Sequence, residues 1–581
     1  MKQLLLGNAA VARGLYEAGC RFVSAYPGTP STEISEQAAL YDEIYAEWAP
    51  NEKVAMEAAI GAAFGGARSF CGMKHVGLNV AADPLFTASY TGVNAGMVIC
   101  VADDPGMHSS QNEQDSRHYA EAAKLPMVEP SDSAECLEFT KTAYEISEQF
   151  DVPVILRSCT RVAHSQSLVE LSDRVEHELK PFEKNPRKYV MMPGNAIGRH
   201  VVVEDRQARL REYAETTPLN RVEMGDTSVG FITSGTSYQY LREVFPNASI
   251  LKLGMVYPLP VQLIKDFASK VGKLIVCEEL DPFIENHCRA IGVRVDGGKD
   301  IFGLQGELSQ SRIAERMGLS AKPSVEFGEN VPARPPVLCP GCPHRGVFYA
   351  LHKLGVTVFG DIGCYTLGAL PPLGAVDTTV CMGASISGMH GFNTARGAES
   401  AKNTVSVIGD STFAHSGITS LIDLVYNNGS STAIILDNSI TGMTGHQQNP
   451  TTGKTLKGDP APAVNIEKLC EAIGVKHDNI RVCDPYALKE FEQIVREELA
   501  KPEPSVIIAR RPCALLPEVK PLPPLVVDSD KCVGCKMCMR IGCPAISVTD
   551  GKAAIDPTLC VGCDLCIQMC RPGAIGKNQE V

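Results

Sequence analysis

Hydrophobic and polar positions alternate along the chain in blocks that predict strands followed by helices. The clearest block is 405–448, where a short β-branched segment ends in Gly409-Asp410, a helix with apolar periodicity follows, and a second hydrophobic segment ends in Asp437-Asn438. This order predicts a parallel βαβ unit. The two polar ends then lie at the carboxyl edge of one sheet, where such folds bind ligands. Asp410 and Asn438 can therefore offer oxygens to one hard cation such as Mg²⁺.

The same alternation recurs on both sides of this block and predicts an α/β protein of several domains. Proline-rich stretches at 329–338 and 516–524 are typical of linkers. We predict a doubly wound α/β domain at 1–170, a charged connector with some helix and no clear strand at 171–225, a smaller α/β domain at 226–325, a third α/β domain at 335–515, and a separate tail at 522–581.

Composition narrows the classes of function. A chain of 581 residues is too long for a single hydrophobic core. Its content of 44% hydrophobic and 21% charged residues is typical of globular proteins. A net charge of −13 argues against a nucleic-acid surface and against binding to anionic membranes. We find no signal-peptide pattern and no apolar run approaching ~20 residues, so we expect a cytoplasmic protein with small-molecule ligands and protein partners.

Eight of the 22 cysteines lie in the tail, between Cys532 and Cys570. Their spacing, C-x₂-C-x₂-C-x₄-C-P followed by C-x₂-C-x₂-C-x₃-C, resembles bacterial ferredoxins with two [4Fe-4S] clusters, although the first motif has four residues before its last cysteine and Arg571 precedes the final proline. In such domains each cluster takes its fourth ligand from the other motif. The resemblance implies one cluster on Cys532, Cys535, Cys538 and Cys570, and another on Cys560, Cys563, Cys566 and Cys543. The alternative is a zinc-ribbon-like domain, which this paired spacing does not favour.

Gly409-Asp410 with Asn438 28 residues after the aspartate resembles the magnesium-diphosphate motif of thiamine diphosphate enzymes. Ser411 stands where that motif often has a second glycine. The resemblance implies that Mg²⁺ is bound by Asp410, Asn438 and the carbonyl of Ile440, with Gly409, Ser411, Thr444 and Gly445 also in the cofactor site. The alternative is a generic Rossmann-like turn.

Two segments of the first domain resemble the pyrimidine-binding domain of 2-oxoacid:ferredoxin oxidoreductases: Tyr26-Pro-Gly-Thr-Pro-Ser31, and Glu52-Lys-Val-Ala55 with the glycines that follow it. The resemblance implies that Glu52 is the carboxyl group that activates thiamine and that Thr29 faces the substrate. Glu57 is the second candidate, and a surface carboxylate is the plain alternative for both. The first and third domains would then have to meet, within one chain or across a dimer.

A third cluster is predicted in the third domain. Cys339, Cys342, Cys364 and Cys513 resemble the ligands of a [4Fe-4S] cluster close to the thiamine in related oxidoreductases, with Cys513 the weakest match. The alternative is that some of these are buried free thiols. The remaining ten cysteines have no partner spacing, and we predict packed thiols.

The order of these parts resembles the alpha subunits of indolepyruvate:ferredoxin oxidoreductases, with a middle domain similar to the C-terminal domain of transketolase. That resemblance implies that an arylpyruvate, coenzyme A and oxidised ferredoxin give arylacetyl-CoA, CO₂ and reduced ferredoxin, with a separate beta subunit and a dimer of alpha–beta pairs. Pyruvate-specific relatives place an arginine near the position of Asp103 or Asp104, so pyruvate is disfavoured. Another 2-oxoacid, a non-oxidative thiamine decarboxylase and a pure electron-transfer protein remain as alternatives.

Overall fold

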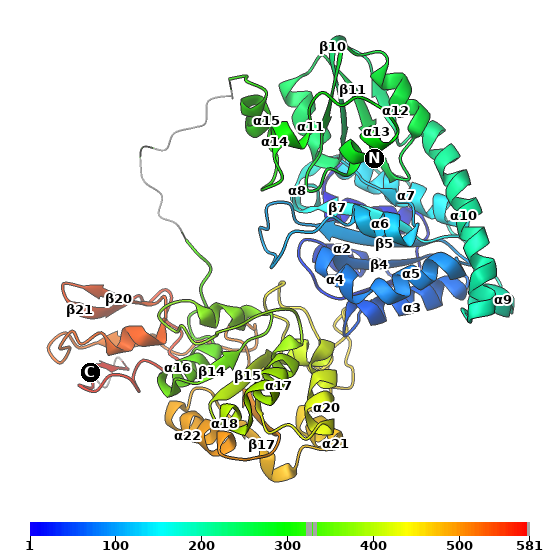
Figure 1. Cartoon of the computed structure of the whole chain (residues 1–581). Helices are drawn as coiled ribbons and strands as arrows, with labels where there is room; N and C mark the ends of the chain where they lie inside the picture. The colour runs from blue at the N-terminus through cyan, green and yellow to red at the C-terminus, as the bar shows by residue number, and fades with distance from the viewer. Residues whose placement is uncertain (321–327, 329–333, 578–581) are drawn as a thin grey trace. The chain divides into compact units, whose positions relative to one another are not determined.

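The computed structural model describes residues 1–320, 328 and 334–577, in two compact units, Met1–Gly328 and Glu329–Val581 (Figure 1). The end of the predicted middle domain, 321–325, and the first half of the predicted linker 329–338 lie outside the described residues. Among the helices that are described, none is both long and apolar enough to cross a membrane.

The first unit is built on a seven-stranded sheet in the order β12-β6-β7-β5-β4-β2-β3. Its strands are β2 (Phe22–Ala25), β3 (Tyr45–Trp48), β4 (Ser69–Lys74), β5 (Met97–Asp103), β6 (Met127–Val128), β7 (Val154–Cys159) and β12 (Met255–Tyr257). All neighbours are parallel except β12, and every residue of β4, β5 and β7 is buried. Strands that are buried along their whole length need helices on both faces of the sheet.

Helices pack on both faces of the sheet. On one face α1 (Gly7–Glu17) packs against α2 (Thr32–Ala38) and α7 (Ser133–Phe150). On the other face α3 (Glu52–Phe64) packs against α5 (Ala82–Thr91). The chain moves outward from β2 to β3 and then returns past β2 to β4, so the order reverses between β2 and β4. Doubly wound sheets bind ligands at such a switch point.

The predicted first and middle domains belong to one unit. A second sheet, in the order β13-β10-β11-β9, contains β9 (Arg221–Glu223), β10 (Asp226–Ser234), β11 (Ala248–Leu253) and β13 (Lys273–Cys277). Between β11 and α12 (Val261–Ala268) the chain adds β12 to the edge of the first sheet, antiparallel to β6. The charged segment 171–225 holds the 24-residue helix α10 (Pro193–Thr216) and the strand β9, so our prediction of no strand there is wrong.

A network of buried ion pairs around Arg157 connects the first sheet with the second. Arg157 on β7 is 3% exposed, and its Nε donates to Asp103 Oδ2 at 2.7 Å while Nη1 donates to Glu129. Asp115 lies 3.9 Å from the same guanidinium, and Arg117 links Asp115 to Glu278 of the second sheet's edge. Burial raises the pKa of Asp103, and Arg157 opposes that shift. The pairing is therefore needed to keep the carboxylates charged inside the protein.

We expect Arg157→Met to lower the local unfolding free energy of β5 and β7 by about 3–5 kcal/mol, because it leaves buried carboxylates without a cation. Hydrogen–deuterium exchange of peptides from these strands measures this effect. Arg161→Met is the matched control, since Arg161 pairs with Glu307 at the surface with 53% of its side chain exposed and should cost less than about 1 kcal/mol. Equal exchange in the two variants would contradict the prediction.

The second unit contains a five-stranded, fully parallel sheet in the order β14-β15-β16-β18-β17. The strands are β14 (Thr357–Phe359), β15 (Thr404–Gly409), β16 (Thr432–Asp437), β17 (Ile480–Cys483) and β18 (Ser505–Arg510). One core packs the sheet against α16 (His344–Leu354) and α22 (Leu488–Leu499), and another packs it against α17 (Ala384–Arg396), α20 (Ile418–Tyr426) and α21 (Ile466–Ile473). Gly409 pairs with Leu436, so the ends of β15 and β16 lie side by side.

The tail is a small β structure within the second unit. β19 (Val526–Val527) pairs with β22 (Ile575–Gly576), and β20 (Ile546–Thr549) pairs with β21 (Lys552–Ile555), while η4 (Met537–Ile541) is a 3₁₀ turn. Its core gathers apolar residues of the tail around the cysteines, and Leu488 of α22 joins that core. The tail is thereby fixed to the third α/β domain.

Candidate active site and cysteine sites

Asp410 is the first residue of a helical segment that begins at the end of β15. The segment runs through α19 (Asp410–Thr412) and a π-helical turn, η2 (Phe413–Gly417), into α20. Asp410 is 1% exposed; its Oδ1 accepts from Ser411 N at 2.7 Å and its Oδ2 accepts from Thr451 Oγ1 at 3.5 Å. A helix N-terminus is an anion-binding position, which suits a diphosphate.

Three predicted metal ligands come together at this point. One terminal atom of the Asn438 amide lies 3.2 Å from Asp410 Oδ1 and 3.0 Å from the Ile440 carbonyl oxygen. The orientation of an amide is assigned from its partners. With nitrogen in this position it donates to both oxygens, and with oxygen there three oxygens face one another, an arrangement that a hard cation stabilises. The residues therefore fit Mg²⁺.

Burial, with a smaller contribution from the nearby Asp437, raises the pKa of Asp410 to about 7, while the Ser411 amide opposes this shift. A buried carboxyl with no cation resists ionisation. A divalent ion at the three oxygens would reverse this by favouring the carboxylate. Asp437 itself accepts from Arg510 Nε at 2.6 Å and is thereby engaged in a separate pair.

The remaining predicted cofactor residues lie on the loop after β16 or beside it. Ser411 is buried and its Oγ accepts from Thr441 Oγ1 at 2.9 Å. Thr444 Oγ1 donates to Gln447 Oε1 at 2.5 Å, and Gly445 is exposed with φ of 121°. The structure thus groups Ser411 with Asp410, whereas Thr444 and Gly445 lie further along the loop after β16. Thr451, which the sequence did not single out, contacts Asp410 from the same loop.

In the first unit, burial separates the two candidate glutamates. Glu52 is 5% exposed at the start of α3, whose N-cap Asn51 accepts from Val54 N at 2.9 Å. A Cβ on Gly77 would stand 2.6 Å from Glu52 Oε1, so only glycine fits beside that carboxyl. Glu57 is at the surface, 47% exposed, and is paired with Lys53. The structure therefore favours Glu52 as the buried, positioned carboxyl.

Thr29 lies at the switch point of the first sheet. It follows β2 and is half-buried, and its neighbour Gly28 packs closely against Lys74 at the end of β4. Lys74 Nζ donates to the carbonyl of Ser109, in the loop after β5. The ends of β2, β4 and β5 thus meet in one place, as a ligand site of a doubly wound fold requires.

Asp104, one of the two positions where the sequence resemblance implies an arginine in pyruvate-specific relatives, is a buried and hydrogen-bonded carboxylate. Asp104 Oδ2 accepts from Ser109 N at 2.9 Å and from Ser110 Oγ at 2.6 Å, and Oδ1 accepts from Thr160 Oγ1 at 2.6 Å. These bonds lower the pKa of Asp104 against the effect of burial. The carboxylate fixes the loop, and it offers no cation to a substrate carboxylate.

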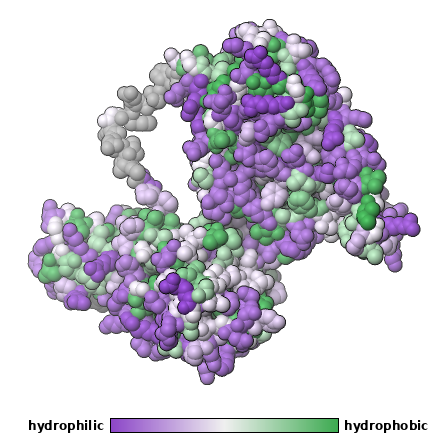
Figure 2. Space-filling view, viewed as in Figure 1, coloured by the Kyte–Doolittle hydropathy of each residue, from purple (hydrophilic) through white to green (hydrophobic). Residues whose placement is uncertain are grey.

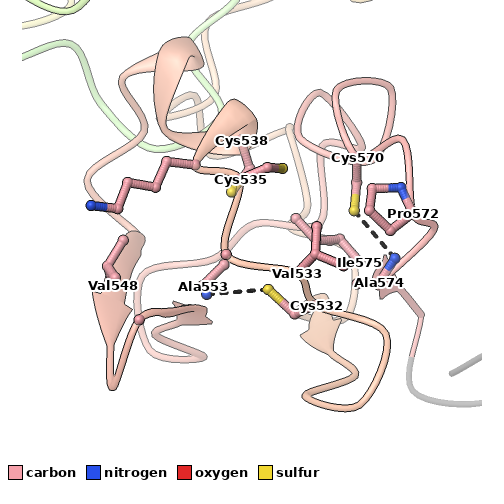
Figure 3. A pocket seen from close by; sticks show the side chains of 13 residues that line it. Cys532, Val533, Cys535, Cys538, Val548, Ala553, Cys570, Pro572, Ala574 and Ile575 are labelled. Atoms are coloured by element: carbon pink, nitrogen blue, oxygen red, sulfur yellow. Dashed lines mark hydrogen bonds between the residues drawn. The ribbon is translucent and has the colours of Figure 1, made fainter.

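The eight tail cysteines fall into two groups, and the groups are those that the cross-motif rule predicts. Figure 3 shows one cavity, surrounded by the first group. A second cavity is lined by the other group. The members are Cys532, Cys535, Cys538 and Cys570 in the first cavity, and Cys543, Cys560, Cys563 and Cys566 in the second.

Backbone amides donate to several of these sulfurs. Ala553 N donates to Cys532 Sγ at 3.4 Å and Ala574 N to Cys570 Sγ at 3.2 Å (Figure 3), while Leu525 N donates to Cys560 Sγ at 3.4 Å. Such bonds stabilise a thiolate, and they lower the pKa of Cys532. Cavities lined by four sulfurs with N–H donors fit iron–sulfur ligation, in which hydrogen bonds to sulfur help to set the potential.

The four cysteines of the predicted third cluster lie in the second unit near the ends of its strands. Cys513 N donates to the Asn438 carbonyl at 3.0 Å, and Cys513 Sγ is 3.8 Å from His446 Nε2. Burial, with smaller contributions from the nearby Cys513 and Cys339, raises the pKa of Cys364 to about 11. The pKa of Cys342 is raised by burial and, to a smaller extent, by the nearby Cys364 and Cys339. Of the ten cysteines predicted as packed thiols, nine are buried, but Cys381 is exposed.

Comparison with known proteins identifies the class first. The model "Pyruvate flavodoxin/ferredoxin oxidoreductase, thiamine diP-bdg" matches residues 13–223, and "Thiamine pyrophosphate enzyme, C-terminal TPP binding domain" matches residues 361–509. The chain is therefore a subunit of a thiamine diphosphate-dependent oxidoreductase with a multidomain α/β fold. Among solved structures it is similar to a 2-oxoglutarate:ferredoxin oxidoreductase from Magnetococcus marinus, with a TM-score of 0.46 and 18% identity over 55% of this chain and 65% of that one.

Full-length relatives identify the family. The indolepyruvate oxidoreductase subunit IorA of Archaeoglobus fulgidus is 41% identical over 99% of this chain and 97% of its own length. That of Pyrococcus horikoshii is 40% identical over 100% of this chain and 97% of its own length. The chain belongs to the family of indolepyruvate oxidoreductase subunit IorA, which confirms the family predicted from the sequence.

Proposed function

We propose that this chain is the thiamine-binding subunit of an enzyme that oxidises arylpyruvates, with indolepyruvate as the type substrate. The products are the arylacetyl-CoA, CO₂ and reduced ferredoxin. The observation that carries the proposal is the convergence of Asp410, Asn438 and the Ile440 carbonyl in the same unit as the two cysteine-lined cavities. A cofactor site and an electron exit in one unit are what oxidative decarboxylation needs.

In this proposal Asp410, Asn438 and Ile440 hold Mg²⁺, and the amides at the start of α19 face the diphosphate. Thiamine diphosphate, when bound, supplies the carbon nucleophile and the electron sink that decarboxylation of a 2-oxoacid requires. Glu52 is the buried carboxyl that exchanges a proton with the aminopyrimidine, and Thr29 faces the substrate. Gly409, Ser411, Thr444 and Gly445 line the cofactor site.

The tail carries two [4Fe-4S] clusters, one in each cysteine-lined cavity, and forms a ferredoxin-like domain. Two observations support this assignment: four cysteines line each cavity, and backbone N–H groups donate to the sulfurs of Cys532, Cys560 and Cys570. A third cluster on Cys339, Cys342, Cys364 and Cys513 lies on the route between the cofactor and the tail. Two clusters give about eight iron atoms per chain and three give about twelve.

A beta subunit and ferredoxin are the proposed protein partners, with a dimer of alpha–beta pairs as the assembly. The segment from 182 to 201 supports binding of a partner because it exposes large apolar side chains, and Figure 2 shows hydrophobic residues among the hydrophilic ones on this face of the molecule. Exposed apolar side chains that gather in one segment are typical of interaction sites. Its members are Phe182, Val190, Met192, Ile197 and Val201, all at least 50% exposed.

The test is an anaerobic panel of 2-oxoacids with thiamine diphosphate, Mg²⁺, coenzyme A and the beta subunit present. We expect indolepyruvate to reduce ferredoxin or a viologen dye only when coenzyme A is added, together with an iron content of about eight or twelve atoms per chain. Faster turnover of 2-oxoglutarate than of any arylpyruvate would contradict the substrate. Release of an aldehyde without dye reduction would indicate a non-oxidative decarboxylase instead.

A further inference from the structure

Arg345 lies between two groups of cysteines and is 2% exposed. It is the second residue of α16, directly after the Cys339–Cys342 segment, and its Nε donates to the Cys339 carbonyl at 2.9 Å. Its Nη2 donates to the Leu338 carbonyl. On the tail side its Nη1 donates to the Ile541 carbonyl at 3.3 Å and to the carbonyl of Gly542, the residue before Cys543. The guanidinium therefore connects the two cysteine segments.

This cation has only neutral hydrogen-bond acceptors. All four acceptors are backbone carbonyls, and within the described part of the chain no carboxylate forms an ion pair with Arg345. A buried charge normally has a counter-charge. The start of a helix makes the cost larger, because the positive end of the helix dipole disfavours a cation. Arg157, in the first unit, shows the ordinary solution, with two carboxylates in direct contact.

The groups beside Arg345 that can become anionic are cysteine sulfurs. Arg345 lines the cavity that contains Cys543, Cys560, Cys563 and Cys566. Neutral thiols would leave the guanidinium uncompensated, but thiolates bound to iron would balance it. The arginine is thus built for the cluster-loaded protein.

We propose that Arg345 is the buried counter-cation of the cluster bound by Cys543, Cys560, Cys563 and Cys566, and that it raises the reduction potential of this cluster. The inference rests on the proposed function, which places the cluster there. Each reduction adds one electron to the cluster and changes no bond, and the electron passes on to ferredoxin, so the two electrons from one 2-oxoacid need two such steps. A fixed cation in a low-dielectric site stabilises the more negative, reduced form.

The experiment compares Arg345→Met, Arg345→Lys and Arg540→Met in the full chain, reconstituted anaerobically with iron and sulfide. Arg345→Met removes the charge, and Arg345→Lys keeps it but loses the planar fork. Arg540→Met removes a charge from an exposed position in η4, the turn whose Ile541 carbonyl accepts from Arg345. Iron content is measured first, and the clusters are then titrated with dithionite at controlled potentials and followed by electron paramagnetic resonance.

We expect all three variants to hold as much iron as the native chain. At one fixed potential the reduced-to-oxidised ratio of one cluster should fall at least tenfold in Arg345→Met, equivalent to about 59 mV for a one-electron couple. Arg345→Lys and Arg540→Met should stay within threefold of the native ratio. Iron loss in Arg345→Met but not in Arg345→Lys would also support the role of the charge, because assembly would then depend on it.

Unchanged titration in Arg345→Met would overturn the inference, as would equal shifts or equal iron loss in the methionine and lysine variants, which would make Arg345 a structural brace. These outcomes leave the proposed function intact. A native chain that binds no iron would instead overturn the proposed clusters, and the inference with them.

Discussion

Replacing Glu52 with glutamine should lower the rate of indolepyruvate-dependent dye reduction by at least about 100-fold, the usual contribution of a positioned acid–base group. Glutamine keeps the shape of the side chain that packs against Gly77 but cannot exchange a proton with thiamine. The rate is measured anaerobically with saturating thiamine diphosphate, Mg²⁺ and coenzyme A and with the beta subunit. Binding of thiamine diphosphate, measured separately by calorimetry, should remain within a few-fold of native.

Glu57→Gln provides the matched control, since it makes the same chemical change on the same helix at an exposed residue that pairs with Lys53. It should leave turnover close to native. Full activity in Glu52→Gln would exclude Glu52 as the activating carboxyl, and loss of activity in Glu57→Gln with retention in Glu52→Gln would move the role to Glu57.

The choice between these glutamates shows what the sequence could and could not provide. The glycine spacing after Glu52 and the resemblance to a pyrimidine-binding domain favoured Glu52. Helix periodicity could not decide, because small apolar residues are distributed around α3 and give it no distinct inward face. Burial of Glu52 depends on α4 (His75–Val80), where Gly77 leaves space for the carboxyl. Such a contact between separate helices has no signature in local sequence.

Local patterns agree with the grouping of the tail cysteines around two cavities and with the polar ends of β15 and β16, while the clusters themselves stay a prediction. The cysteine groups follow from ligand spacing within short segments, and the polar residues after β15 and β16 follow from the rule that parallel strands end at one edge. The union of the first and middle domains was missed because β12 has three residues, too few for a periodic pattern, and pairs with a strand more than 100 positions away. Thr451 was missed because it contacts Asp410 from 41 positions away, through the folded loop after β16.

Asp410→Asn should weaken Mg²⁺-dependent binding of thiamine diphosphate by about 100-fold or more, since loss of a direct ligand exceeds the 10–100-fold typical of groups that only support one. Asparagine can still hydrogen-bond but brings no negative charge to the cation. Binding is measured by calorimetry at several Mg²⁺ concentrations, and the Mg²⁺ dependence should disappear. Asp423→Asn, an exposed aspartate on α20 of the same βαβ unit, should bind like the native chain.

The stability of the metal-free protein shows whether Asp410→Asn weakens cofactor binding directly or by unfolding the chain. Burial raises the folded-state pKa of Asp410 to about 7, so the ionised carboxylate destabilises the folded protein. That cost is absent at acidic pH, grows as pH rises above the ordinary carboxyl pKa, and is complete above pH 7. Asp410→Asn should therefore make the metal-free chain more stable than native at pH 8 and similar to native at pH 4, as followed by thermal unfolding. Added Mg²⁺ with thiamine diphosphate should make the native chain the more stable of the two at pH 8, because only the native carboxylate gains a counter-ion. A variant that is less stable than native without metal would show that Asp410 serves the fold rather than the cation.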